Sequence, residues 1–144
     1  MQNPPPVQTS SQPPAQVAKS STGLDENVAA LLSYVVGWIT GLIFFMIEKD
    51  SRLVRFHAMQ SLILSGGGMV IIIALWIFIF VASLIVGQIS GLLSFLLTTV
   101  LGLVAGVAGL AILIGAIISL IKAYQGQYFK LPVVGNLAEK YSAK

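Results

Sequence analysis

The sequence predicts an all-α integral membrane protein with three transmembrane helices and a short interfacial segment between the first two helices. Residues 58–121 form a run of 64 residues without Asp, Glu, Lys, Arg or His. Charged residues make up only 9% of the chain, against about 25% in soluble domains, and the mean hydropathy is +0.91. Because one span needs about 20 apolar residues, this run is expected to cross the membrane twice, with one turn between the crossings.

The polar N-terminal segment, residues 1–24, is predicted to be a disordered tail. It is rich in Pro, Gln and Ser, and Lys19 is its only charged residue. Such a composition buries too little apolar surface to offset the entropy of ordering. We expect no signal peptide, because a basic start and a short apolar core are missing. Residues 25–141 are then expected to form the three-span domain, with residues 122–144 as the polar C-terminal tail.

The first span is expected over residues 28–47. The polar residues 25–27 just before it are suited to a helix start, since side-chain oxygens and negative charge satisfy free amide groups there. The following 20 uncharged residues match the length of one crossing. Gly37 and Gly41 have the spacing that lets two helix backbones approach closely, although glycine is also common in membrane helices in general.

A dense polar cluster, residues 48–57, follows the first span and is expected to lie at the membrane interface. The second span is predicted over residues 58–86, before the turn-like residues 87–91. Its 29 residues would measure about 43 Å as a helix, more than the roughly 30 Å hydrocarbon core. The helix therefore either tilts or has its first turns at the membrane surface.

The third span is predicted over residues 92–121 and carries a stripe of small residues: Gly102, Ala105, Gly106 and Gly109. The stripe favours helix packing, either against the small face of the first span or between two copies of the chain. The sequence does not separate these two arrangements. Beyond the span the chain turns polar, and residues 136–141 are expected to form one last short helix.

The basic residues predict the orientation of a multi-pass protein of the cell membrane. With three spans, the first loop and the C-terminal tail share one side and hold seven basic residues, whereas the other side holds only Lys19. By the positive-inside rule, the C-terminus is then cytoplasmic and the N-terminus lies outside. Four spans would divide the basic residues five to three, and the cleaner asymmetry favours three.

The candidate contact residues gather at the entrance of the second span and are Arg52, Arg55, His57, Gln60 and Ser61. The spacing of the last three, i, i+3 and i+4, places them on one helical face. A polar stripe that enters a membrane helix can bind an ion, a lipid head group or a peptide, or it can cap and pack the interface. The two arginines can hold an anionic lipid or simply anchor the span.

Catalytic and metal sites are not predicted. The chain has no cysteine and one histidine, and a single histidine does not build a metal site. No set of nucleophile, base and acid is visible, and no glycine-rich phosphate loop follows a strand. We therefore expect no catalytic residues, no metal and no cofactor.

Several stretches of the sequence resemble one family. They run from Glu26 to Tyr34, Gly37 to Gly41, Glu48 to Asp50 and Val54 to Ser61, with residues 124–126 and 131–138 in the tail. Together they resemble the small bacterial and archaeal membrane proteins grouped with the chloroplast inner-envelope protein import (Tic) component, over about residues 25–140. The resemblance implies a helical membrane protein of a mostly uncharacterised group. The import component is regarded as a four-span translocon subunit, whereas this chain is predicted to have three spans.

The sequence leaves two main functions open. The first is a scaffold or accessory subunit of a membrane complex without enzymatic activity, which the glycine faces and the uncharged spans indicate. The second is a protein translocation or transport component, which the resemblance implies; a membrane enzyme has the least support. The expected partners are membrane lipids and, through the glycine faces, a second copy or other membrane proteins. Nucleic acid is not expected.

Overall fold

The computed structural model describes residues 18–143, which fold into helices joined by short turns. The elements are α1 (Glu26–Leu32), α2 (Trp38–Ile47), α3 (Arg52–Ser61), the π-helical segment η1 (Leu62–Gly67), α4 (Gly68–Gly87), α5 (Gly91–Tyr124) and α6 (Val134–Ser142). Two helical stretches are long and apolar enough to cross a membrane, and α2 is a shorter apolar helix. The predicted fold class, an all-α membrane protein, is therefore confirmed.

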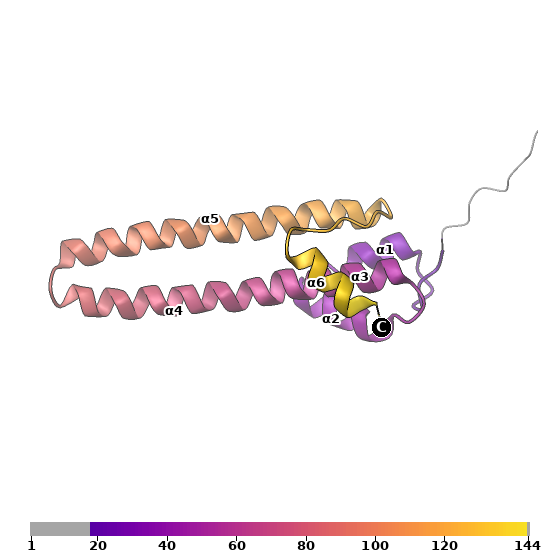
Figure 1. Ribbon diagram of the computed structural model, residues 1–144, viewed down its shortest axis with the longest axis horizontal. Helices are drawn as coiled ribbons and strands as arrows, with labels where there is room; N and C mark the ends of the chain where they lie inside the picture. The colour runs from indigo at the N-terminus through magenta and orange to yellow at the C-terminus, as the bar shows by residue number, and fades with distance from the viewer. Residues whose placement is uncertain (1–17, 144) are drawn as a thin grey trace, which may run out of the picture.

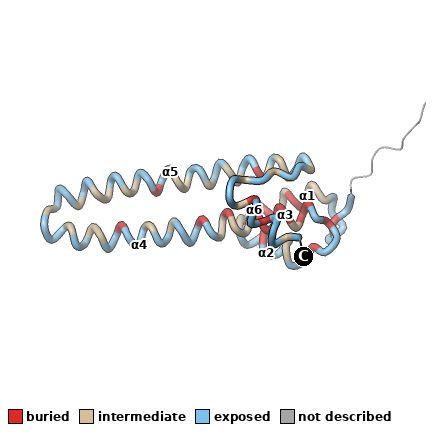
Figure 2. Tube along the Cα trace, in the orientation of Figure 1, coloured by how far each residue is buried: buried red, intermediate tan, exposed pale blue. Residues whose placement is uncertain are grey.

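A long helical hairpin dominates the molecule (Figure 1). Its first arm is the continuous helix Arg52–Gly87, of 36 residues, formed by α3, η1 and α4, and its second arm is α5, of 34 residues. The Ser90 hydroxyl accepts a hydrogen bond from the amide of Leu93 and thereby caps α5. Most of the hairpin surface away from its open end is exposed (Figure 2), as expected for helices that face lipid.

The short helices α1, α2, α3 and α6, together with η1, gather at the open end of the hairpin (Figure 1). We call this cluster the base. Ala29 and Ala30 of α1 are fully buried there with Val54 of α3 and Ala123 of α5. Small side chains at these contacts let the helices approach closely, and Figure 2 shows the buried residues concentrated at this end.

The segment 28–47 is not one helix, which corrects the expected first span. Helix α1 ends at Leu32, and α2 begins only at Trp38, after a turn. Gly37 has φ +60°, a conformation that glycine adopts without strain. The Thr40 hydroxyl accepts from the amide of Val36 (3.2 Å) and donates to the carbonyl of Ser33 (3.1 Å). In this turn, hydrogen bonds to the Thr40 side chain replace backbone hydrogen bonds of a continuous helix. The 10 residues of α2 extend about 15 Å, which is half of the thickness of the hydrocarbon core.

Residues 18–24 are held against the base, which corrects the C-terminal end of the predicted disordered tail. The amide and hydroxyl of Ser21 donate to the Glu48 carboxylate at 3.1 and 2.8 Å, and the amide of Ser20 donates to the carbonyl of Leu24. The remainder of that prediction, residues 1–17, lies outside the described residues.

Both ends of the described chain lie at the same end of the molecule. Ser21 contacts Glu48, whose carbonyl accepts a 2.8 Å hydrogen bond from Arg55. The Nε of Arg55 in turn donates to the carbonyl of Ser142 at 3.4 Å. The expectation that the two ends flank opposite sides of the membrane rested on an unbroken first span. That segment is divided into α1 and α2, and the sides on which the two ends lie stay a prediction.

Candidate functional site

A buried polar cluster lies where α1, α3 and α5 meet in the base. Its side chains are Tyr34, His57, Gln60 and Ser119. Three of them are fully buried and Tyr34 is 8% exposed. Helix α3 presents His57 and Gln60 on one face, as their spacing predicts, while α5 contributes Ser119 and the turn after α1 contributes Tyr34.

The hydrogen bonds of His57 fix its tautomer. Its Nε2 lies 2.9 Å from the carbonyl oxygen of Gln127, which can only accept, so Nε2 carries the proton. The neutral ring then has an acceptor at Nδ1, and the Tyr34 hydroxyl, 3.2 Å away, donates to it. The rings of Tyr34 and His57 also pack edge to face, with centroids 5.8 Å apart. His57 therefore joins the turn after α1, through Tyr34, to the segment between α5 and α6, through Gln127.

Gln60 extends this network to α5. Its amide nitrogen lies 3.2 Å from the Tyr34 oxygen, 3.1 Å from the Ser119 hydroxyl and 3.1 Å from the carbonyl of Phe129. Since the Phe129 carbonyl can only accept, the amide is oriented with its nitrogen toward this group. The Gln60 Oε1 is buried and has no hydrogen-bond partner among the described residues.

Ser61 does not join this network but holds the turn before α2. Its hydroxyl donates to the carbonyl of Gly37 at 3.1 Å. A Cβ at Gly37 would lie 3.0 Å from the Ser65 hydroxyl, and one at Gly41 would lie 2.9 Å from the carbonyl oxygen of Ala58. The predicted small face of the first segment thus packs against α3 and η1 of the same chain.

The small residues of α5 lie differently. A Cβ at Gly102, Gly106 or Gly109 would meet no atom within 4 Å. Ala105, in contrast, is 4% exposed. The described residues therefore do not bring this stripe together with Gly37 and Gly41, and a side chain added at any of its three glycines would meet open space.

Arg52 and Arg55 lie at the first turns of α3, apart from the buried cluster. Arg52 is exposed. The guanidinium of Arg55 donates to the carbonyl of Glu48 and stacks 4.9 Å from the centre of the Phe45 ring. Of the five candidate contact residues, the structure thus brings His57 and Gln60 into one network and leaves the others in separate roles.

Glu48 is a fully buried carboxylate whose role the sequence reasoning missed. Its Oε1 accepts from the amides of Ser51 (2.8 Å) and Asp50 (3.0 Å) and from the Ser21 hydroxyl. Burial alone would raise the pKa of this carboxyl, but these hydrogen bonds, with that from the Ser21 amide, hold it below its usual value. The sequence signal for this role was a Glu three residues before Ser51, the N-cap of α3, where a carboxylate can accept backbone amide hydrogen bonds.

Tyr34 and Ser119 were also missed as members of the cluster. Ser119 is the one hydroxyl residue between residues 100 and 121, and Tyr34 carries a polar group into an apolar segment. Both features point to a buried hydrogen bond, because an unpaired hydroxyl in an apolar environment is costly. Their partners could not be read from the sequence, since Ser119 lies 59 positions from Gln60.

These side chains form a buried hydrogen-bonded cluster that holds several segments of the chain together. The cluster bonds mainly to itself and to backbone carbonyls, and it joins the segments around residues 34, 60, 119 and 128. Among the described residues, no group of three or more His, Asp or Glu side chains is arranged to hold a metal ion.

Comparison with known proteins assigns the family. A family model described as the magnetosome magnetite crystal formation protein family, MamF/MmsF, matches residues 23–138. The chain belongs to this family. It is 40% identical over 126 residues to a UPF0132 membrane protein of Methanocaldococcus jannaschii, a match that covers 88% of this chain and 96% of that protein. No solved structure matches the chain.

Two further relatives are also described as UPF0132 membrane proteins. One, from Archaeoglobus fulgidus, is 39% identical over 117 residues, which cover 81% of this chain and 95% of that protein. A second protein of Methanocaldococcus jannaschii is 37% identical over 121 residues, which cover 83% of this chain and 71% of that protein. None of these comparisons links the chain to the chloroplast import components, so this family replaces the resemblance drawn from the sequence stretches. Like its relatives, the chain is a small membrane protein.

Proposed function

We propose that the protein is a non-enzymatic scaffold or accessory subunit of a membrane complex, which associates through the glycine face of α5. The observation that carries this proposal is the open space around Gly102, Gly106 and Gly109. In lipid, small residues promote helix association because they let backbones pack closely. The packed Gly37 and Gly41 in the same chain illustrate such contacts, whereas the α5 glycines have no counterpart within the described residues.

The closed polar cluster supports a structural role over catalysis or transport. Its members are buried and directed at one another. A transport site would instead present polar groups to a water-filled path near the midplane. The translocation alternative also loses the family resemblance on which it rested.

The association is testable by cysteine crosslinking, because the chain has no cysteine of its own. Gly106→Cys places a thiol on the glycine face, and Val104→Cys places one at similar depth on another face of α5, where Val104 is 60% exposed. We expect oxidative crosslinking in native membranes to join Gly106→Cys to a second copy or to another membrane protein, and Val104→Cys to remain uncrosslinked. Equal crosslinking of both variants, or of neither, would contradict the proposal.

We further propose that the base, with both ends of the described chain, faces the cytoplasm. The basic residues of the described chain belong to the base and its adjoining segments, while the hairpin turn at residues 88–90 has none. The positive-inside rule then favours a cytoplasmic base, with α1 and α2 dipping into the near leaflet. Support comes from the exposed apolar side chains of α2, including Ile43 at 47% and Met46 at 71%.

Labelling of intact cells with a membrane-impermeant maleimide tests this orientation. Gln88→Cys, in the hairpin turn, is expected to react in intact cells, whereas Lys19→Cys and Lys140→Cys are expected to react only after permeabilisation. Reaction of Lys19→Cys in intact cells, with Lys140→Cys still protected, would restore the arrangement in which the two ends lie on opposite sides.

A further inference from the structure

A second site lies on the outer surface of the base, apart from the buried cluster. It is a hollow of about 500 Å³ between the start of α3, the segment after α5 and α6, lined by Lys49, Asp50, Arg52, Arg55, Tyr128 and Glu139, with Phe56 also in its wall. Its volume falls within the range of about 300–1,000 Å³ that is usual for small-molecule sites.

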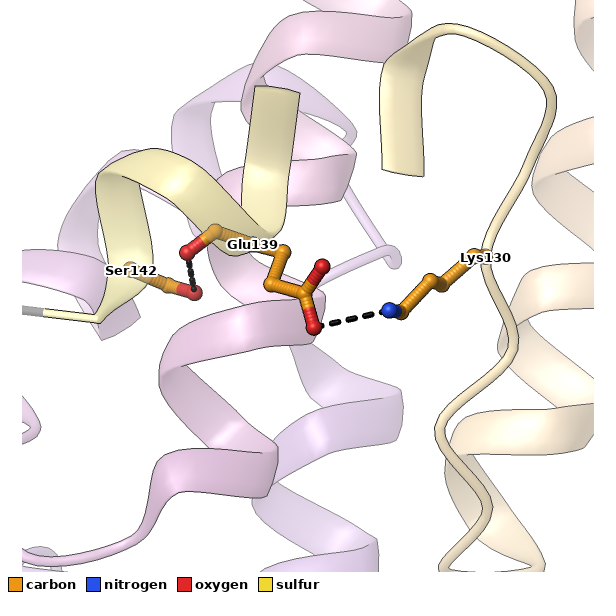
Figure 3. A network of polar contacts seen from close by, with 3 residues as sticks. All are labelled: Lys130, Glu139 and Ser142. Carbon is orange, nitrogen blue, oxygen red and sulfur yellow. Dashed lines mark hydrogen bonds and ion pairs between the residues drawn. The ribbon is translucent and has the colours of Figure 1, made fainter. Parts of the chain in front are cut away.

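The charges of this hollow favour an anion. Three of its lining side chains are cationic, and its two carboxylates already have partners. Asp50 lies 2.8 Å from the Ser21 hydroxyl, whose single proton is shared between the carboxylates of Asp50 and Glu48. Glu139 forms a 2.7 Å ion pair with Lys130, which Figure 3 shows reaching across from the segment before α6.

The cations differ in how firmly they are held. Arg55 is fixed by the carbonyl of Glu48 and by the Phe45 ring, so its charge stays at the wall of the hollow. The Lys49 ammonium and the Arg52 guanidinium have no hydrogen bond or ion pair within the described residues, and both residues are exposed. The Lys49 hydrogen bond to the Ser21 hydroxyl comes from its backbone amide. The side chains of Lys49 and Arg52 are therefore available to bind an anionic ligand that enters the hollow from the surface.

The position and the aromatic wall of the hollow point to a lipid. Arg52 begins the 36-residue helical stretch that is long and apolar enough to cross a membrane, and the charge-free run starts less than two turns later, at Ala58. Phe56 packs on Tyr128 with ring centroids 5.5 Å apart, and Tyr128 is 56% exposed. Tyrosine beside basic residues is typical of the level of the phosphate head groups.

We infer that this hollow binds the head group of an anionic phospholipid, whose phosphate lies between Lys49 and Arg52. Free phosphate shares the chemistry, but lipid head groups are present at high local concentration at this depth. The inference does not depend on association through α5.

Native mass spectrometry of the full chain in mild detergent tests the site. Phosphatidylglycerol and phosphatidylcholine with the same acyl chains are titrated separately. We expect wild-type protein to retain phosphatidylglycerol preferentially. The double variant Lys49→Gln and Arg52→Gln is expected to bind it about 25-fold more weakly, because each cation that lies against the bound phosphate contributes about fivefold.

A matched control removes the same charge elsewhere at the same end of the molecule. Lys122→Gln combined with Lys140→Gln alters two cations that do not line the hollow and should leave retention unchanged. Glu139→Gln should instead strengthen it several-fold, because a carboxylate leaves the wall. A strengthened complex would also show that the Glu139→Gln variant is folded.

Three results would overturn the inference. The first is equal retention of the two lipids by wild-type protein. The second is an equal loss in the control pair, which would indicate attraction to surface charge in general. The third is displacement of the lipid by excess inorganic phosphate together with phosphate binding in its absence, which would assign the hollow to a soluble anion.

Discussion

The packing of α2 on α3 predicts that Gly41→Ala destabilises the protein. The added Cβ would lie 2.9 Å from the carbonyl oxygen of Ala58 and 3.0 Å from the amide nitrogen of Leu62. Both atoms belong to helix backbone, so α2 must move away from its neighbour. Overpacking of this kind costs about 1–3 kcal/mol, and the better helix propensity of alanine returns about 0.5–1 kcal/mol. We expect a net loss of about 1 kcal/mol.

Gly106→Ala is the matched control for this substitution. A Cβ there meets no atom of the same chain within 4 Å. In the monomeric protein only the gain in helix propensity remains, and the free energy of unfolding should rise by about 0.5–1 kcal/mol. Both variants are measured by SDS titration of the protein in detergent micelles. If Gly41→Ala and Gly106→Ala gave the same change, α2 would not pack on α3, as it would not in a straight span over residues 28–47.

Three further substitutions probe the base. Tyr34→Phe removes the donor to His57 and should cost about 1–3 kcal/mol of unfolding free energy, measured against the exposed Tyr124→Phe, for which no change is expected. The lowered pKa of Glu48 means that its stabilisation is complete above its ordinary value of 4.5 and is lost as the pH falls through the lower folded value; Glu48→Gln should flatten this part of the curve of stability against pH. Gly126→Ala places a side chain at φ +69° and within 2.9 Å of the Asn27 amide oxygen, so a lower midpoint of thermal unfolding is expected, and an unchanged midpoint would contradict the placement of this turn.

The sequence by itself determined the class of the protein. A run of 64 residues without a charge has one stable environment, the hydrocarbon core, and backbone groups there are satisfied within helices. Its length also requires that it fold back. These conclusions depend only on the composition and length of one continuous stretch, and they require no knowledge of which distant residues meet.

The tertiary structure decided which small and polar residues meet. Gly37 with Gly41 and Gly102 with Gly106 have the same spacing, yet the first pair packs tightly and the second is open. The spacing places residues on a helical face but does not specify what covers that face. Likewise, Tyr34, Gln60 and Ser119 meet only because α1 turns back at Gly37 and packs on α3 and α5. That turn depends on the conformation of Gly37, on the Thr40 hydroxyl within the segment and on the Ser61 hydroxyl from α3. The largely apolar pattern of residues 28–47 did not reveal it.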